Sequence, residues 1–153
     1  MTTAIQPRIQ TGHVGVNVTD LARAQAFYES VFGFETIKKS TENGREYAFL
    51  AEGETLVLTL WRQSEGRFSK SSPGLHHLSF LVPDIDAVRA IESKARAAGA
   101  AFAYEGVVPH VEGAQSGGIF FEDPDGVRLE VFTTTGAGEQ AAPTEGAPTC
   151  GFF

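Results

Sequence analysis

The feature of this chain that most constrains its fold is an internal repeat. The nine residues that start at His13 recur in similar form in the nine that start at His77, at a constant offset of 64 residues. In each copy apolar residues recur at every second position, Val14, Val16 and Val18 or Leu78, Phe80 and Val82, as in a half-buried strand. Each copy then reaches a polar stop, Asp20 or Asp84, after which apolar residues follow at helical spacing. A repeated strand–helix unit predicts two modules of the same architecture within one chain.

Three strand-like runs follow each predicted helix. Turn signals separate the runs, and Asp123-Pro124-Asp125-Gly126 is a strong one. The runs cover residues 34–38, 46–50 and 55–61 in the first half, and residues 100–104, 118–121 and 127–132 in the second. We therefore predict an α+β fold in which two tandem βαβββ modules form a cupped, eight-stranded mixed sheet, or half-barrel, around a shared cavity.

Composition divides the rest of the chain into an extension, a linker and a tail. We place an N-terminal extension at 1–10, the first module at 11–62, a Ser- and Gly-rich linker at 63–74, the second module at 75–133 and a Gly-, Ala- and Pro-rich tail at 134–153. The tail ends in Phe152-Phe153, whose burial can help to offset the entropy of ordering it. We expect it to dock over the open mouth of the sheet or on a second copy of the chain in a homodimer.

The charge balance favours a small-molecule partner. Acidic residues outnumber basic ones by 19 to 12, for a formal net charge of −7, and the basic residues are scattered, which argues against nucleic-acid binding. The first residues lack the apolar stretch of a signal peptide, and no later run is apolar enough to span a bilayer. A single cysteine, Cys150, allows no intramolecular disulfide. We expect a cytoplasmic protein that binds neither nucleic acid nor a membrane.

Two histidines and a glutamate form the candidate site. His13 and His77 occupy equivalent positions in the repeat, and strand parity turns both toward the cavity. Glu130 interrupts an apolar run in the last predicted strand, where an ionised carboxylate is costly unless it is paired or bound to a metal. Each residue alone has a structural or solvent-exposed alternative. Together, two imidazoles and one carboxylate make a facial ligand set with positions open for water, substrate or oxygen.

These patterns resemble the vicinal oxygen chelate superfamily, which includes glyoxalase I, extradiol dioxygenases, fosfomycin-resistance enzymes and bleomycin-binding proteins. The resemblance covers residues 11–133 and rests on GHVGVNVTDLARAQAFYESVFGFE in the first half and on HHLSFLV and FFEDPDGVRLEVF in the second. It implies that the two modules surround one divalent metal ion per chain, with His13, His77 and Glu130 as its ligands. Fe(II) or Mn(II) is the favoured ion, with Zn, Ni and Co as alternatives.

Departures from the patterns of individual members narrow the choice of reaction. Enzymes of the glyoxalase I type have a fourth protein ligand in the first module, where this chain has Val57 or Leu58, which cannot bind a metal. Fosfomycin transferases have a threonine two residues after the first ligand, where this chain has Gly15. The stretch after Glu130 also has no basic group for a phosphonate. Both of these reactions are therefore disfavoured.

Extradiol dioxygenases share the set of two histidines and one carboxylate. This chain comes close to their sequence signature with His110, the Asp-Pro-x-Gly turn and Glu130. The spacer after His110 is slightly longer than in the signature, and Phe120 stands where the signature has a tyrosine. His110 could act as a catalytic acid or base near neutral pH, because its ordinary pKa is about 6.5. Alternatively, His110 is a solvent-exposed histidine in a loop, without a catalytic role.

We therefore favour a mononuclear metalloenzyme of dioxygenase type that acts on a small, oxygen-chelating organic substrate. One alternative is a metal-dependent lyase or isomerase of glyoxalase or thiol-transferase type. The other is a non-catalytic protein that sequesters a drug, as bleomycin-binding members do, although retention of all three ligand types argues against that role. The residues expected to bind the substrate are Asn17, Tyr47, Trp61, Ser79 and Phe120.

Overall fold

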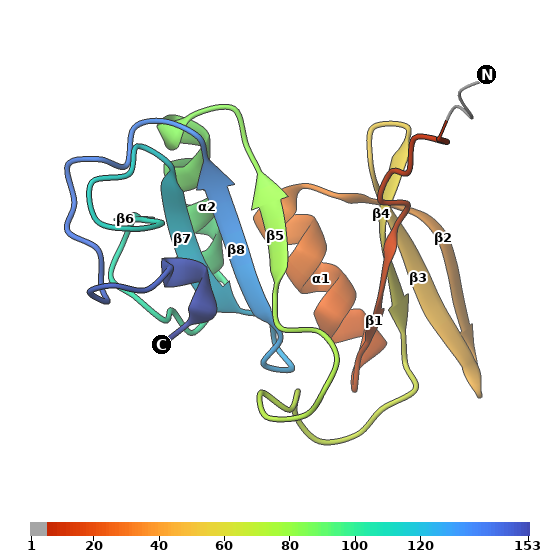
Figure 1. Ribbon diagram of the computed structural model, residues 1–153. Coiled ribbons are helices and arrows are strands. Elements are labelled where there is room, and N and C mark those ends of the chain that lie inside the picture. The colour runs from red at the N-terminus through yellow and green to blue at the C-terminus, as the bar shows by residue number, and fades with distance from the viewer. Residues whose placement is uncertain (1–5) are drawn as a thin grey trace.

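The structure, a computed structural model, describes residues 6–153 and contains two four-stranded mixed sheets (Figure 1). The first sheet has the order β1-β4-β3-β2, formed by β1 (Val14–Asn17), β4 (Thr55–Trp61), β3 (Arg45–Glu52) and β2 (Glu35–Glu42). The second has the order β5-β8-β7-β6, formed by β5 (Leu78–Leu81), β8 (Arg128–Thr133), β7 (Gly117–Glu122) and β6 (Val108–Pro109). Each module contributes one helix, α1 (Leu21–Phe32) or α2 (Ile85–Ala97). The predicted α+β class and the two βαβββ modules are confirmed.

The same capping signal starts both helices. The Asp20 side chain accepts a hydrogen bond from the backbone N–H of Arg23 (3.0 Å), and the Asp84 side chain accepts one from that of Ala87 (2.8 Å). Gly33 ends α1 with a φ of 74°, a left-handed conformation that glycine adopts without steric cost. Each helix therefore starts just after the first strand of its module and packs back on that module.

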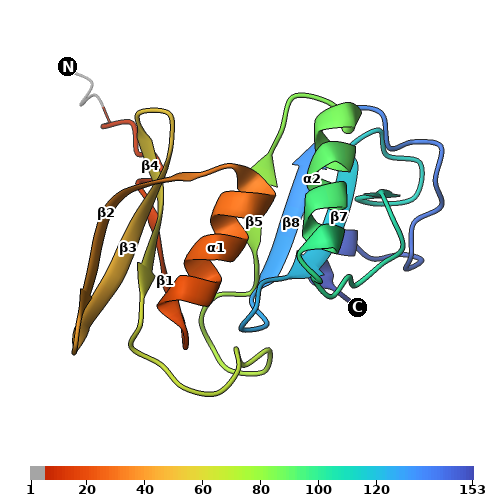
Figure 2. The same ribbon diagram turned by 180° about the vertical axis from the view of Figure 1, so that it is seen from behind.

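Helix α1 lies between the two sheets (Figures 1 and 2). It covers one face of the first sheet and also reaches the second module, where Phe32 packs on Phe80 with ring centroids 4.8 Å apart. Helix α2 covers one face of the second sheet, the face turned toward the viewer in Figure 2. The eight strands are thus divided between two sheets of four, and the face of the first sheet that is free of α1 points away from the second module.

The edge of the second sheet differs from the prediction. Residues 100–104, predicted as a strand, form only an isolated bridge to β7 at Phe102. The edge strand is β6 instead, which pairs with β7 at Gly117. A side chain would prevent this close approach, because a Cβ at Gly117 would lie 2.3 Å from the carbonyl oxygen of Val108. As a result, β6 delivers the next residue, His110, to the face of the sheet opposite α2.

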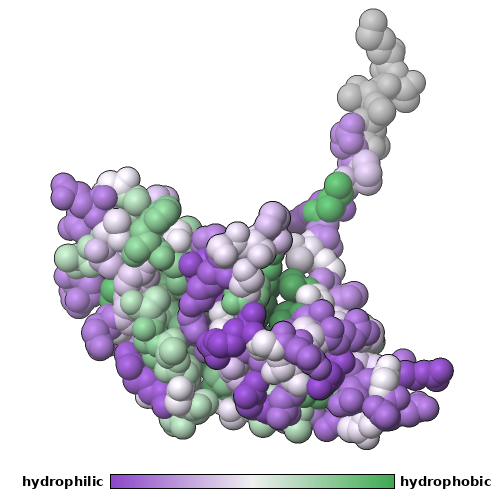
Figure 3. Space-filling model, turned by 90° about the horizontal axis from the view of Figure 1, so that it is seen from below, coloured by the Kyte–Doolittle hydropathy of each residue, from purple (hydrophilic) through white to green (hydrophobic). Residues whose placement is uncertain are grey.

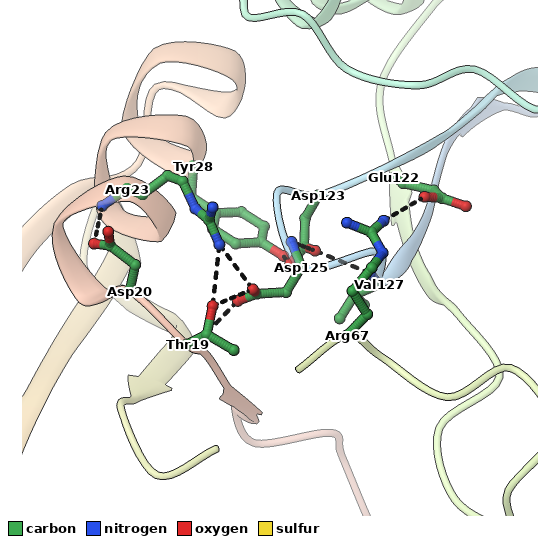
Figure 4. Close-up of polar contacts among 9 residues, drawn as sticks. All are labelled: Thr19, Asp20, Arg23, Tyr28, Arg67, Glu122, Asp123, Asp125 and Val127. Carbon is green, nitrogen blue, oxygen red and sulfur yellow. Dashed lines mark hydrogen bonds and ion pairs between the residues drawn. The ribbon is translucent and has the colours of Figure 1, made fainter. Parts of the chain in front are cut away.

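The turn between β7 and β8 joins the two modules (Figure 4). The Asp125 carboxylate accepts hydrogen bonds from the backbone N–H (3.0 Å) and the hydroxyl (2.5 Å) of Thr19, and it pairs with Arg23 (2.9 Å). The Asp123 carboxylate accepts a hydrogen bond from the buried hydroxyl of Tyr28 (2.8 Å). We call these five residues the inter-module clasp. Three of them come from the first module and two from the second, so the clasp holds α1 against the second sheet.

The tail crosses the face of the second sheet that is opposite α2, which we call the open face (Figures 1 and 2). Near its end it forms one short 3-10 helix, Thr149–Gly151. Within the described residues, neither α-helix has the length and hydropathy needed to cross a bilayer.

Candidate functional site

Glu130 lies on the open face of the second sheet. Its neighbours along β8, Leu129 and Val131, belong to the hydrophobic core, so the alternation of the strand turns Glu130 to the other face. In the strand register, Phe120 of β7 and Ser79 of β5 stand on either side of it. Glu130 is only 3% exposed, and a carboxylate buried to this extent needs polar partners.

Two histidines supply those partners, one on each carboxylate oxygen. His77 Nε2 lies 3.2 Å from Oε2 of Glu130, and His110 Nε2 lies 2.6 Å from Oε1. We call these three residues the His–Glu cluster. It brings together two of the three predicted metal ligands, His77 and Glu130, and the candidate acid–base residue His110.

Each histidine of the cluster has a further partner on its other ring nitrogen. His110 Nδ1 lies 2.9 Å from Oγ of Ser116, and His77 Nδ1 lies 2.8 Å from Nδ1 of His76. A partner on Nδ1 fixes the orientation of the ring and leaves Nε2 directed at Glu130. Histidine ligands are commonly held in this way in metal sites, and imidazole and carboxylate groups suit Fe(II) or Mn(II).

The donor set therefore fits a divalent transition metal, but it forms only part of a site. Within residues 6–153, no three His, Cys, Asp or Glu side chains are already grouped so that they could hold a metal ion. In the cluster, a hydrogen bond joins His110 to one carboxylate oxygen of Glu130, and Nε2 of His77 lies against the other.

His13 does not join the cluster within the chain. It is exposed and directly precedes β1 in the first sheet, whereas His77 precedes β5 in the second, and α1 lies between the two sheets (Figure 1). The repeat register therefore places the two histidines equivalently in their own modules without bringing them into contact. His13 as a ligand stays a prediction.

The residues predicted to bind the substrate are divided between the two sheets. Tyr47 and Trp61 lie side by side on the face of the first sheet away from α1, with ring centroids 5.4 Å apart. Asn17, at the end of β1, is exposed. The other two flank the glutamate of the cluster, where Ser79 is exposed and Phe120 is fully buried. A single chain therefore does not gather all five around one cavity.

The tail covers part of the cluster through Phe152. Its ring centroid lies 5.7 Å from that of His77 and 5.4 Å from that of Phe120. Of the two phenylalanines at the end of the chain, Phe152 is partly buried, whereas Phe153 is 75% exposed. The open mouth of the sheet, one of the two expected docking places, is thus occupied by Phe152.

Thr149 anchors this end of the tail. Its hydroxyl donates a hydrogen bond to the carbonyl oxygen of Pro109 (2.6 Å), and its backbone N–H donates one to that of His110 (2.7 Å). Thr149 is almost fully buried, so both bonds are shielded from water. The anchor ties the tail to the residue that carries one imidazole of the cluster.

Sequence reasoning missed Arg128, which shares the open face with Glu130. It lies two positions before Glu130 on β8, and its guanidinium carbon is 5.2 Å from the ring centroid of Phe152. The available signal was the alternation of the strand, which brings residues 128 and 130 to one face. No basic group follows Glu130 along the strand, but one, Arg128, precedes it on the same face.

A separate cavity of about 510 Å³ lies between α1, the end of α2 and the clasp. Its lining includes Arg23 and Asp123, both members of the clasp, so it belongs to the contact between the modules. Seen from below, where the linker and the clasp lie, the surface is mostly hydrophilic, and hydrophobic residues gather over the second module (Figure 3).

Comparison with known proteins identifies a family with this architecture. The family model described as "Glyoxalase/Bleomycin resistance protein/Dioxygenase superfamily" matches residues 10–131. The chain is 31% identical over 122 residues to a probable trivalent organoarsenical cleaving enzyme of Bacillus subtilis (strain 168), a match that covers 80% of this chain and 78% of the relative. It is 26% identical over 132 residues to catechol-2,3-dioxygenase of the same strain, covering 85% of this chain but only 43% of that enzyme.

Among solved structures, the chain is similar to a mutant of the fosfomycin resistance protein FosX from Listeria monocytogenes, complexed with Mn(II) and 1S,2S-dihydroxypropylphosphonic acid. The TM-score is 0.64 at 20% identity, over 82% of this chain and 92% of that one. This likeness shows a common fold. Taken with the paired modules and the family match over most of the sequence, it leads to one conclusion: the chain belongs to the glyoxalase/bleomycin resistance protein/dioxygenase superfamily.

Proposed function

We propose that the chain is a mononuclear metalloenzyme of dioxygenase type that binds a small organic substrate through two neighbouring oxygen atoms. The observation that carries this proposal is the His–Glu cluster, in which a buried carboxylate meets an imidazole nitrogen on each oxygen. Membership of the superfamily and the similarity to catechol-2,3-dioxygenase support the reaction class.

His77 and Glu130, joined by His13, would hold the metal. Fe(II) or Mn(II) suits this mixture of imidazole and carboxylate donors, and the Mn(II) of the FosX complex supports the choice. When bound, the metal supplies a Lewis acid that polarises the two oxygens of the substrate. His76, whose Nδ1 lies against that of His77, can keep the ligand ring in the orientation that directs Nε2 to the site.

His110 is the residue that we expect to move a proton. Its Nε2 points to Glu130 and its Nδ1 contacts the hydroxyl of Ser116. Because a hydroxyl can donate or accept a hydrogen bond, Ser116 is compatible with either neutral tautomer. His110 can therefore hold a proton on Nε2, or accept one there from a hydroxyl of the substrate.

A second copy of the chain is the proposed source of His13. The face of the first sheet away from α1 carries a partly exposed aromatic cluster of Tyr47, Phe49 and Trp61, with ring centroids 5.3–5.8 Å apart. We call it the aromatic face. His13 precedes β1 in the same sheet, so a partner that covers the aromatic face would also meet His13.

The open face of the second sheet has room for such a partner. Phe152 covers it beside Phe120 of β7, but on β5 the side chains of Ser79 and Leu81 remain exposed, Leu81 at 64%. In a two-fold symmetric homodimer, the aromatic face of each copy would pack on this side of the other copy. Each of the two sites would then combine His13 of one copy with His77 and Glu130 of the other.

Metal content and oxygen uptake test the proposed function. Protein purified without added metal should retain a divalent transition metal or bind added Fe(II) or Mn(II), and the loaded protein should consume oxygen with members of a catechol panel. A protein that binds neither ion would contradict the whole proposal. Tight metal binding without oxygen uptake on any catechol would exclude the dioxygenase class.

A metal-dependent lyase is the second candidate, favoured by the 31% identity to the probable organoarsenical cleaving enzyme. The same residues would hold the metal, so metal content does not separate the two reactions. Incubation of the loaded protein with a trivalent organoarsenical does, because cleavage of the carbon–arsenic bond releases inorganic arsenic. Release of inorganic arsenic together with inactivity on catechols would favour the lyase.

A further inference from the structure

We infer that the substrate carries an anionic group and that Arg128 binds it, next to the His–Glu cluster. The inference deepens the proposed function and rests on it in one respect: the chelating oxygens of the substrate are taken to lie at the cluster. It adds the chemical class of the substrate and a residue that recognises it.

The first argument is position. Arg128 and Glu130 are two residues apart on β8 and face the same side of the sheet, because Leu129 between them is buried in the core. Alternate residues of a strand are separated by about 6.6 Å. One small molecule can therefore place its chelating oxygens at the cluster and an oxyanion at the guanidinium.

The second argument is the lack of a protein partner for the charge of Arg128. Within residues 6–153, no carboxylate lies at ion-pair distance from its guanidinium, although the side chain is partly buried. The carboxylate that stands opposite it in the strand register, that of Glu122, is paired with Arg67 (3.4 Å) and with Lys70 instead. A partly buried guanidinium without an anion remains available to an anionic ligand.

The third argument is that the tail holds this guanidinium in place. Phe152 stacks under it at 5.2 Å and is, among the described residues, the only one other than glycine with a positive φ, at 56°. A strained backbone of this kind persists only where its surroundings hold it, and the buried anchor at Thr149 does so. Stacking on an aromatic ring leaves the planar fork of donors of an arginine free to meet an oxyanion.

The field of Arg128 reaches Tyr104, which contacts the end of the tail. Lost hydration raises the pKa of Tyr104, and the charge of Arg128 opposes that rise. In a chain with a formal net charge of −7, which repels anions in general, this guanidinium makes the open face locally attractive to them.

The recognised group is an oxyanion, because a guanidinium donates two parallel hydrogen bonds to a carboxylate or a phosphonate alike. A pair of probes that differ only in this group tests the inference: catechol, and 3,4-dihydroxybenzoate, which adds a carboxylate to the same diol. Titration calorimetry under anaerobic conditions, on the Mn(II)-loaded protein, gives the dissociation constant of each. We expect the wild type to prefer 3,4-dihydroxybenzoate by about tenfold or more.

Three variants assign the preference to Arg128. Arg128→Gln should bind the two probes about equally, and Arg128→Lys should keep part of the preference because it retains the charge but not the planar fork. The matched control is Arg89→Gln, which removes the same charge from an exposed position on α2, behind the sheet, and should leave the preference unchanged. Competition by acetate against competition by methylphosphonate shows which oxyanion fits better.

The outcomes separate this inference from the proposed function. A wild type without preference for the carboxylate, or a preference that survives in Arg128→Gln, overturns the inference. Mn(II) affinity should not weaken in Arg128→Gln, because no ligand is lost. If the wild type binds no Mn(II) but metal-free protein prefers the carboxylate and Arg128→Gln abolishes that preference, the anion site stands and the proposed function fails.

Discussion

Glu130 is the side chain on which the proposed site depends most, and Glu130→Gln tests it with little change in shape. The amide is isosteric with the carboxylate, and Leu129 and Val131 still hold the strand in the core, so the fold should be retained. The affinity for Mn(II) should fall by about two orders of magnitude or more, since even loss of a residue that only supports a ligand costs about 10- to 100-fold. Calorimetric titration, with circular dichroism as the check on folding, measures both. Unchanged affinity would mean that Glu130 is not a ligand.

Strand parity explains which side chains of the site could be predicted. Alternation along single strands placed His77 and Glu130 on one face, and the structure brings their side chains to 3.2 Å. The same rule, applied to β8, would have found Arg128. The apolar end of the tail predicted that it would dock, but no local pattern could choose between this face and a second copy. The choice depends on hydrogen bonds from Thr149 to a segment some 40 residues earlier in the chain.

The turn between β7 and β8 shows the same limit for a whole element. Asp-Pro-Asp-Gly is recognisable as a turn because each residue type has a local reason to be there. Its role in the clasp cannot be recognised from the sequence. Asp125 forms a hydrogen bond with Thr19, 106 residues away, and Asp123 forms one with Tyr28, 95 residues away. Contacts between residues so far apart depend on how the modules pack, which no local pattern encodes.

The clasp should give the protein a characteristic pH dependence of stability. Burial raises the pKa of Asp123 above its ordinary value, although the hydrogen bond from Tyr28 opposes the rise. The folded protein therefore holds this proton to a higher pH than the unfolded chain does. The stabilisation that such a carboxyl group contributes is fully present below its pKa in the unfolded chain. It is lost as the pH rises through its pKa in the folded protein. The contribution of Asp123 should thus decline as the pH rises above about 4.

Urea unfolding of the wild type and of Asp123→Asn, which cannot titrate, isolates this effect. The free energy of unfolding of the wild type relative to the variant should fall as the pH is raised from about 4 toward 7. Tyr28→Phe is the matched control, because it removes a bond that lowers the pKa of Asp123, so the decline should extend to higher pH. A difference between wild type and Asp123→Asn that is constant with pH would show that Asp123 has the same pKa in both states.

The arrangement of the two modules decides whether a single chain can bring all the predicted site residues together. The repeat predicted the modules correctly, because each is built from local signals such as the caps at Asp20 and Asp84. Whether their strands enclose one cavity depends on which faces meet. In this chain α1 packs between the sheets, with Phe32 against Phe80, so the aromatic face and the open face point in different directions. Under the proposed function, a site that includes His13 would therefore need two copies of the chain.

Mixing two inactive variants tests whether two copies share each site. His13→Ala and Glu130→Gln each damage every site of their own homodimers. Random pairing of equal amounts makes half of the dimers mixed, and in a mixed dimer one site carries both changes while the other carries neither. About a quarter of the wild-type sites should therefore return, measured as Mn(II) bound per chain and as oxygen uptake.

The matched control mixes His77→Ala with Glu130→Gln. These residues belong to the same module and contact each other within one chain, so no mixed dimer has an intact site and nothing should return. A chain that stays monomeric in solution, or a first mixture that recovers no more than the second, would show that His13 is not supplied by a second copy.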